Sequence, residues 1–135
     1  MASIHYEALV DVPAEKAWAA LRDVGAAHHL FAGVLTDAQL EGAVRTVTFA
    51  NGKVVREKIV DVDDEARRVA YAVIDGVFEH HSASMQIFSA GEARCRFVWI
   101  TDILPDDQTA MVRPLVEQGG QALKRVLEAG KDPQG

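Results

Sequence analysis

Four side chains that can do chemistry lie in strand-like segments, at positions where the surrounding pattern otherwise places apolar residues. They are Arg45, Glu57, Tyr71 and His81. A guanidinium can hold a carbonyl oxygen, a carboxylate accepts hydrogen bonds, and a phenol or imidazole can move a proton. Such groups would orient the oxygen atoms of a small molecule. In an enzyme they would deprotonate a carbon beside a carbonyl and stabilise the enolate. For Tyr71 and His81 the alternative is an ordinary place in the core.

The hairpin around Asn51-Gly52 determines whether Arg45 and Glu57 meet. A two-residue Asn51-Gly52 loop would place apolar and charged side chains on one face of the sheet. A three-residue loop over residues 50–52 keeps the alternation and sets Arg45 opposite Glu57. We therefore predict an Arg45–Glu57 ion pair on the inner face. It either borders a wet or ligand-filled cavity, or lies partly solvated at the end of the sheet and holds the register.

The elements that position these residues follow from periodicity. Between residues 34 and 102 the pattern has a period of two and predicts six strands, at about 34–40, 43–50, 53–61, 67–74, 80–89 and 93–102. A strand at 4–10 comes first, followed by helices at about 13–25 and 26–31. The turns are too short for crossover helices, so the strands are antiparallel neighbours. A long helix at about 105–129 completes a two-layer α+β domain, which we expect to span residues 1–135.

The last helix has two unusual features. Pro114 lies inside its apolar stripe and predicts either a kink or a separate first turn. Gly119 and Gly120 follow, each costing about 1 kcal/mol relative to alanine in a helix. The missing side chains either leave room over a hollow sheet or form a notch for helix packing.

Composition narrows the classes of function. The chain has 135 residues, of which 49% are hydrophobic and 25% charged, and its net charge is −6. This composition predicts a globular core and argues against nucleic acid as a partner. The single cysteine, Cys95, is expected to be a small buried residue in a protein of the reducing cytoplasm. No apolar run reaches membrane-spanning length, so we expect no membrane insertion.

Two histidine pairs, His28-His29 and His80-His81, raise the question of zinc. Adjacent residues of a strand point to opposite faces, so His80 and His81 cannot easily share one ion. The ligand spacing of known zinc sites is also missing. The sequence has neither a glycine-rich phosphate loop nor a nucleophile elbow. We therefore expect no metal and no cofactor.

Several motifs stand in an order typical of a known family: Pro13-Ala14-Glu15 before Trp18, Gly42-Ala43-Val44-Arg45, Asn51-Gly52, Glu57, Asp61–Asp64, Tyr71, Gly76, and Trp99 before Pro105. With them the chain resembles the polyketide cyclase/dehydratase branch of the START-like (SRPBCC) superfamily, which includes the birch pollen allergen and the plant abscisic acid receptors. The resemblance implies a helix-grip fold. In that fold a seven-stranded curved antiparallel sheet wraps around a long C-terminal helix, and two short helices lie between strands 1 and 2.

The resemblance also implies an internal cavity that binds a small hydrophobic molecule, such as a lipid or polyketide. His29 falls near a ligand-binding lysine of the abscisic acid receptors, and Glu57 falls at their cavity glutamate. Because His29 is not a lysine, a carboxylate ligand is not implied. The turn at residues 51–53 is too short for their lid, so a hormone-receptor role is not implied either. Resemblance and strand alternation together predict ligand contacts from His29, Arg45, Val47, Phe49, Val55, Glu57, Ile59, Tyr71, Val73, Phe78, His81, Ala83, Met85, Phe97, Trp99, Met111, Leu115, Gly119 and Ala122.

Two hypotheses of function follow. In the first, the protein binds a small apolar molecule in the cavity. In the alternative, it is an enzyme of the polyketide cyclase/dehydratase type, with Arg45, Tyr71 and His81 as the candidate catalytic residues. An assembly module that uses the outer face of the sheet ranks last, because that face shows no large apolar patch.

Overall fold

The computed structural model describes residues 2–76 and 78–130. Its strands are β1 (Ala2–Val10), β2 (Leu35–Glu41), β3 (Val44–Phe49), β4 (Val54–Asp63), β5 (Arg68–Val73), β6 (His80–Ser89) and β7 (Cys95–Leu104). Its helices are α1 (Ala14–Leu21), α2 (Ala27–Leu30) and α3 (Thr109–Ala129), with short 3-10 helices η1 (Val24–Ala26) and η2 (Asp106–Gln108). The predicted order of elements is confirmed. The predicted helix at 13–25 is shorter than expected, because α1 ends at Leu21 and the 3-10 turn η1 follows.

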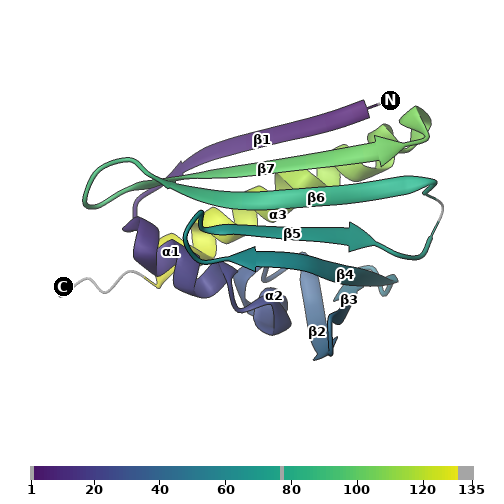
Figure 1. The fold of residues 1–135 in the computed structure, drawn as a ribbon, viewed down its shortest axis with the longest axis horizontal. Coiled ribbons are helices and arrows are strands. Elements are labelled where there is room, and N and C mark those ends of the chain that lie inside the picture. The colour runs from purple at the N-terminus through teal and green to yellow at the C-terminus, as the bar shows by residue number, and fades with distance from the viewer. Residues whose placement is uncertain (1, 77, 131–135) are drawn as a thin grey trace.

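The seven strands form one antiparallel sheet in the order β1-β7-β6-β5-β4-β3-β2. Consecutive strands from β2 to β7 are neighbours, as the short turns between them require. The first strand closes against the last, so the two edges are β1 and β2. Helix α3 lies across the back of this sheet in Figure 1, with α1 and α2 at one end. This is the predicted helix-grip arrangement.

The long helix differs in detail from the prediction. A 3-10 turn does precede it, but this turn ends at Gln108, well before Pro114. The α-helix then runs through Pro114, which is exposed to solvent. Proline removes one backbone donor and crowds the preceding turn. At this position the ring faces water and displaces no core side chain.

Gly119 and Gly120 form a packing notch. A Cβ atom added at Gly119 would lie 2.9 Å from the indole ring of Trp99, and one added at Gly120 would collide with the ring of Tyr6. The missing side chains therefore let α3 approach β7 and β1 closely. For Gly120 this favours the packing notch, because the Tyr6 ring fills the space under it; Gly119 packs against Trp99 and also borders the cavity described below, so both alternatives hold for it.

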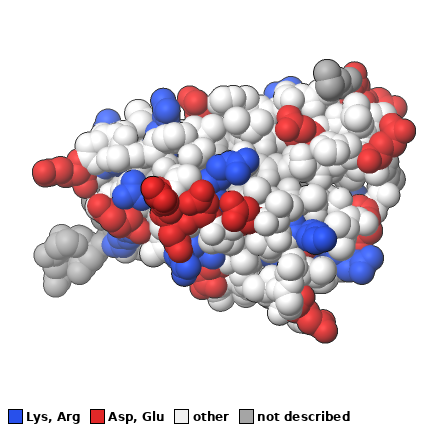
Figure 2. Space-filling model, viewed as in Figure 1, with Lys and Arg blue, Asp and Glu red and all other residues white. Residues whose placement is uncertain are grey.

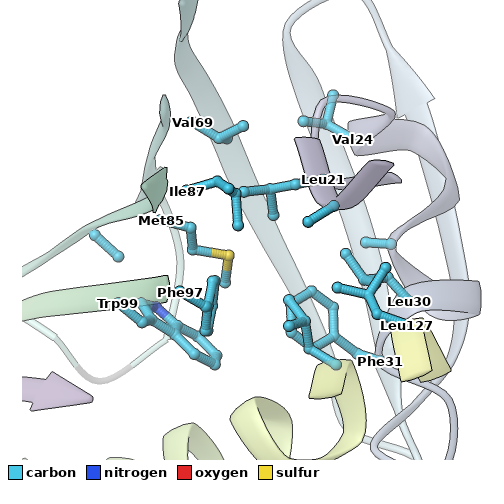
Figure 3. Packing of buried hydrophobic residues seen from close by; sticks show 14 of the residues in the cluster. Leu21, Val24, Leu30, Phe31, Val69, Met85, Ile87, Phe97, Trp99 and Leu127 are labelled. Carbon is cyan, nitrogen blue, oxygen red and sulfur yellow. The ribbon is translucent and has the colours of Figure 1, made fainter. Parts of the chain in front are cut away.

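The alternation in the sheet separates an inner from an outer face. Figure 3 shows the core at the end near the short helices, where Leu21 and Phe31 point toward Met85 and Ile87 on β6. Ile87 is 2% exposed and Phe97 is fully buried. Ile87 and Phe97 therefore lie in a packed part of the inner face, whereas Phe31 and Met85 also border a hollow that extends farther along the sheet.

Candidate functional site

A cavity of about 120 Å³ lies between the inner face of β3–β7 and the helices α2 and α3. That volume is roughly ten times the ~10–15 Å³ needed by a single water, so a small organic molecule has room. Its wall contains most of the residues named from the sequence: Arg45, Val47, Phe49, Val55, Glu57, Tyr71, Val73, Phe78, His81, Met85, Trp99, Met111, Leu115 and Gly119.

Five residues named from the sequence do not belong to this wall: His29, Ile59, Ala83, Phe97 and Ala122. His29 is exposed on α2 and its ring stacks beside that of His28, with 4.0 Å between the ring centroids. Phe97 and Ala122 are fully buried in packed regions. Ala83 is buried and Ile59 half-buried. Alternation predicts which face a side chain is on, but not whether the helix packs directly against it.

The wall also contains residues that were not predicted to be ligand contacts: Ala27, Phe31, Val34, Leu35, Asn51, Lys53, Thr101, Val112 and Val116. Val112 and Val116 follow the same helical spacing as Leu115, so the apolar stripe of α3 was an available signal. Asn51 and Lys53 belong to the β3–β4 turn and are exposed. Their place in the wall depends on how the sheet curves, which the local pattern does not encode.

The predicted ion pair is confirmed. Arg45 stands opposite Glu57 in the β3–β4 register, and both Nε and Nη2 of Arg45 lie 2.8 Å from Oε1 of Glu57. The three-residue loop is also confirmed, because the Phe49 N–H donates to the Lys53 carbonyl over 2.8 Å. The side chains of the pair are only 8% and 10% exposed. Of the two alternatives, the pair therefore borders the cavity and is not a solvated pair at the end of the sheet.

Arg45 is held by more than its counter-ion. Its Nη1 donates to the Val24 carbonyl over 3.2 Å, and its guanidinium carbon lies 5.3 Å from the centre of the Tyr71 ring. Burial raises the pKa of the Glu57 carboxyl, and the charge of Arg45 partly offsets this. Burial likewise raises the pKa of the Tyr71 hydroxyl, with Glu57 adding to the effect, so this phenol is neutral at pH 7.

Three other polar atoms in the cavity wall are buried and lack a hydrogen-bond partner among the described residues. They are Nδ1 of His81, Nε1 of Trp99 and Oγ1 of Thr101. Burial lowers the pKa of His81 to about 4, with a smaller contribution from His80. The imidazole is therefore neutral at pH 7. Two further atoms of this kind, on His28 and Thr109, lie outside the cavity wall.

A second, much smaller pocket of about 10 Å³ lies between the short helices and the sheet, with Leu21, Leu30 and Val69 in its wall. Figure 2 shows acidic and basic side chains mixed over the face seen in Figure 1. Within residues 2–76 and 78–130, no group of three or more His, Cys, Asp or Glu side chains is placed to hold a metal ion. None of the described helices combines the length and apolar character needed to cross a membrane.

Solved structures share this fold at low sequence identity. An uncharacterized protein from Bacillus thuringiensis has a TM-score of 0.84 at 15% identity, covering 93% of this chain and 98% of the other. Norcoclaurine synthase from Thalictrum flavum, in complex with dopamine and hydroxybenzaldehyde, has a TM-score of 0.75 at 20% identity, covering 97% of this chain and 88% of the synthase. The di-domain ARO/CYC protein BexL of the BE-7585A biosynthetic pathway has a TM-score of 0.82 at 19% identity, covering 99% of this chain and 48% of BexL.

Sequence comparison agrees with the fold. No curated protein sequence matches the chain significantly. A family profile described as polyketide cyclase/dehydrase and lipid transport does match, over residues 1–129. This match covers the whole sheet and α3, including the cavity and the Arg45–Glu57 pair. The chain therefore belongs to the polyketide cyclase/dehydrase and lipid transport family, the START-like (SRPBCC) group that its sequence resembles.

Proposed function

We propose that this protein binds a small, largely apolar molecule in the cavity between the sheet and α3. The observation that carries the proposal is the cavity itself, about 120 Å³ of space walled mainly by apolar side chains with a few inward polar groups. This combination is typical of small-molecule sites. The fold adds support, because norcoclaurine synthase was solved with two small aromatic molecules bound.

Binding is better supported than catalysis by the protein's own groups. A proton-transfer group works best when its pKa lies near the working pH. The pKa of His81 is lowered to about 4 and that of Tyr71 is raised, so neither is tuned for proton transfer at neutral pH. Arg45 already donates to Glu57 and to the Val24 carbonyl. A cyclase/dehydratase activity would need a ligand that changes these environments.

The first test is binding of a neutral fluorescent probe, N-phenyl-1-naphthylamine, whose emission rises in apolar surroundings. The cavity-filling variant Leu115→Trp should bind at least about fivefold more weakly, because overpacking costs about 1–3 kcal/mol. Gln118→Trp is the matched control, since Gln118 is exposed on the same helix and lies outside the cavity wall. Equal binding by the wild type and Leu115→Trp would contradict the proposal.

A second test addresses the natural ligand. Native mass spectrometry of the protein purified from its source cells should show an added mass that is absent from Leu115→Trp. Turnover of a polyketide-type substrate that is lost in Tyr71→Phe and His81→Ala would instead favour the enzymatic alternative. Tyr71→Phe keeps the aromatic ring and removes only the hydroxyl, and His81→Ala removes only the imidazole. Loss of activity in variants that still fold would therefore indicate that these groups take part in catalysis.

A further inference from the structure

The three unpartnered polar atoms lie on one wall of the cavity. Trp99 and Thr101 are two residues apart on β7, so their side chains share a face. On β6, Ala83 pairs with Thr101 and His81 pairs with Ile103, which makes His81 the diagonal neighbour of Thr101. We call His81, Trp99 and Thr101 the β6–β7 polar strip. The Arg45–Glu57 pair, from β3 and β4, also lines the cavity, but the Arg45 guanidinium already donates to Oε1 of Glu57 and to the Val24 carbonyl.

Burying the polar atoms of this strip lowers the stability of the fold unless they find hydrogen-bond partners. Most buried polar atoms in proteins have a partner, and each one without a partner costs about 1–3 kcal/mol. Thr101 is 1% exposed and Trp99 8%, so bulk water does not reach them freely. The atoms border a space large enough for a small molecule. The missing partners therefore belong to whatever fills the cavity.

The type of each atom limits that partner. The indole Nε1 of Trp99 only donates, so it requires an acceptor. The Tyr71 hydroxyl lies near enough to interact with this N–H but does not complete a hydrogen bond with it. The Thr101 hydroxyl donates one hydrogen bond and also accepts, and a neutral imidazole offers either role at Nδ1 according to its tautomer. An acceptor oxygen satisfies Trp99, and it satisfies Thr101 equally well. A pure hydrocarbon would leave the whole strip unpaired.

The charge of the cavity limits the partner further. Arg45 is neutralised by Glu57, while His81 and Tyr71 are uncharged at pH 7. The remaining charged group in the wall is Lys53, which is exposed on the β3–β4 turn and hydrated. An anionic group held against the polar strip would be buried without a counter-ion, which is expensive. An uncharged acceptor avoids this cost.

We propose that the ligand is an uncharged molecule with an apolar body and a carbonyl-type oxygen, and that Trp99 and Thr101 donate hydrogen bonds to it. This inference rests on the proposed binding function and adds the chemical class of the ligand and the residues that select it. It predicts selection for a ketone, aldehyde or ester over a hydrocarbon of the same shape and over a carboxylate.

Three probes of similar shape test the inference by isothermal titration calorimetry: 2-acetylnaphthalene, 2-isopropenylnaphthalene and 2-naphthoate. The ketone should bind roughly threefold to tenfold more tightly than the alkene, the ratio expected for one net hydrogen bond. The naphthoate should bind more weakly than the ketone by a similar factor or more. In Trp99→Phe and Thr101→Val the preference for ketone over alkene should shrink toward one, while alkene affinity changes little.

Thr46→Val is the matched control, because Thr46 lies on β3 outside the cavity wall and the variant should keep the wild-type preference. If none of the probes binds, both the proposed function and this inference are wrong. If the alkene binds as tightly as the ketone, or the naphthoate binds best, binding stands and the inference is overturned. An unchanged preference in both Trp99→Phe and Thr101→Val, with folding verified by circular dichroism, also overturns it.

Discussion

Losing either partner of the Arg45–Glu57 pair should cost about as much stability as losing both partners together. Arg45→Met leaves a carboxylate in a site where its side chain is 10% exposed, and Glu57→Leu leaves a guanidinium where its side chain is 8% exposed. Losing one partner of a buried pair costs about 3–5 kcal/mol. We take about 3 kcal/mol for each single variant, since the cavity beside the pair eases solvation.

The double variant Arg45→Met/Glu57→Leu should also lose only about 3 kcal/mol, half of what simple addition predicts. Two apolar side chains then replace the pair, and the main remaining cost is the Val24 carbonyl, which loses the 3.2 Å contact from Arg45. That loss occurs in both the Arg45→Met variant and the double variant, so it cancels when the coupling energy is calculated from the double-mutant cycle. The coupling energy is therefore about 3 kcal/mol.

Equilibrium urea unfolding followed by tryptophan fluorescence measures all four free energies. The matched control is the exposed Arg56–Asp75 pair, 3.0 Å apart with side chains 56% and 36% exposed. Its coupling should stay below about 1 kcal/mol. Additive losses at Arg45 and Glu57, with a coupling no larger than in this control, would refute the claim that the pair is buried and mutually dependent.

The cycle also has a pH dependence. In Arg45→Met the native pKa of Glu57 lies above its unfolded value, because burial raises it and the offsetting charge is gone. The native state then binds more protons than the unfolded state, so the stability of this variant should fall as pH rises. Its loss relative to the wild type should be smaller at pH 5 than at pH 8.

Three further predictions follow. Gly120→Ala should destabilise the protein by about 1–3 kcal/mol in urea unfolding, because the new methyl group meets the Tyr6 ring, and this outweighs the better helix propensity of alanine. In a Tyr6→Ala background most of that penalty should disappear. If the losses of unfolding free energy from the two substitutions simply add, the packing notch is contradicted. NMR titration of His81 in the native protein should give a midpoint near pH 4. Between pH 6.5 and pH 4 the unfolded state then binds the proton before the native state does, so the stability of the fold should decrease as the pH falls through this range. A midpoint near 6.5 would contradict the burial of His81. Cys95 is fully buried and burial raises its pKa, so a thiol reagent should label it only at the rate of unfolding; fast labelling of the native protein would show the strand end to be open.

Much of the fold was accessible from local rules. Two-residue periodicity identified the strands, and the requirement to keep apolar side chains on one face selected the three-residue turn over the two-residue one. That choice alone set Arg45 opposite Glu57. These inferences succeeded because strand register and facing depend on neighbours close in sequence.

Other features depended on elements far apart in the chain. Arg45 and Glu57 were predicted to pair, but only the packed structure shows that they border the cavity and do not lie at a solvated end of the sheet. The glycine pair was ambiguous until Trp99 and Tyr6 were seen to fill its notch. The helix lies close to β1 and β7 at that point, a distance that no local pattern records.

The sequence by itself determined the order of elements, the inner face and the residues that pair across the hairpin. Tertiary structure decided which inward-facing residues are packed in the core and which border the cavity. Phe97 is packed in the core, whereas Trp99, two residues along the same face, borders the cavity. Alternation has only two outcomes, in or out, whereas the gap between sheet and helix varies continuously with sheet curvature and with how closely α3 approaches. The unpartnered atoms of Trp99 and Thr101 emerge only once that gap is known.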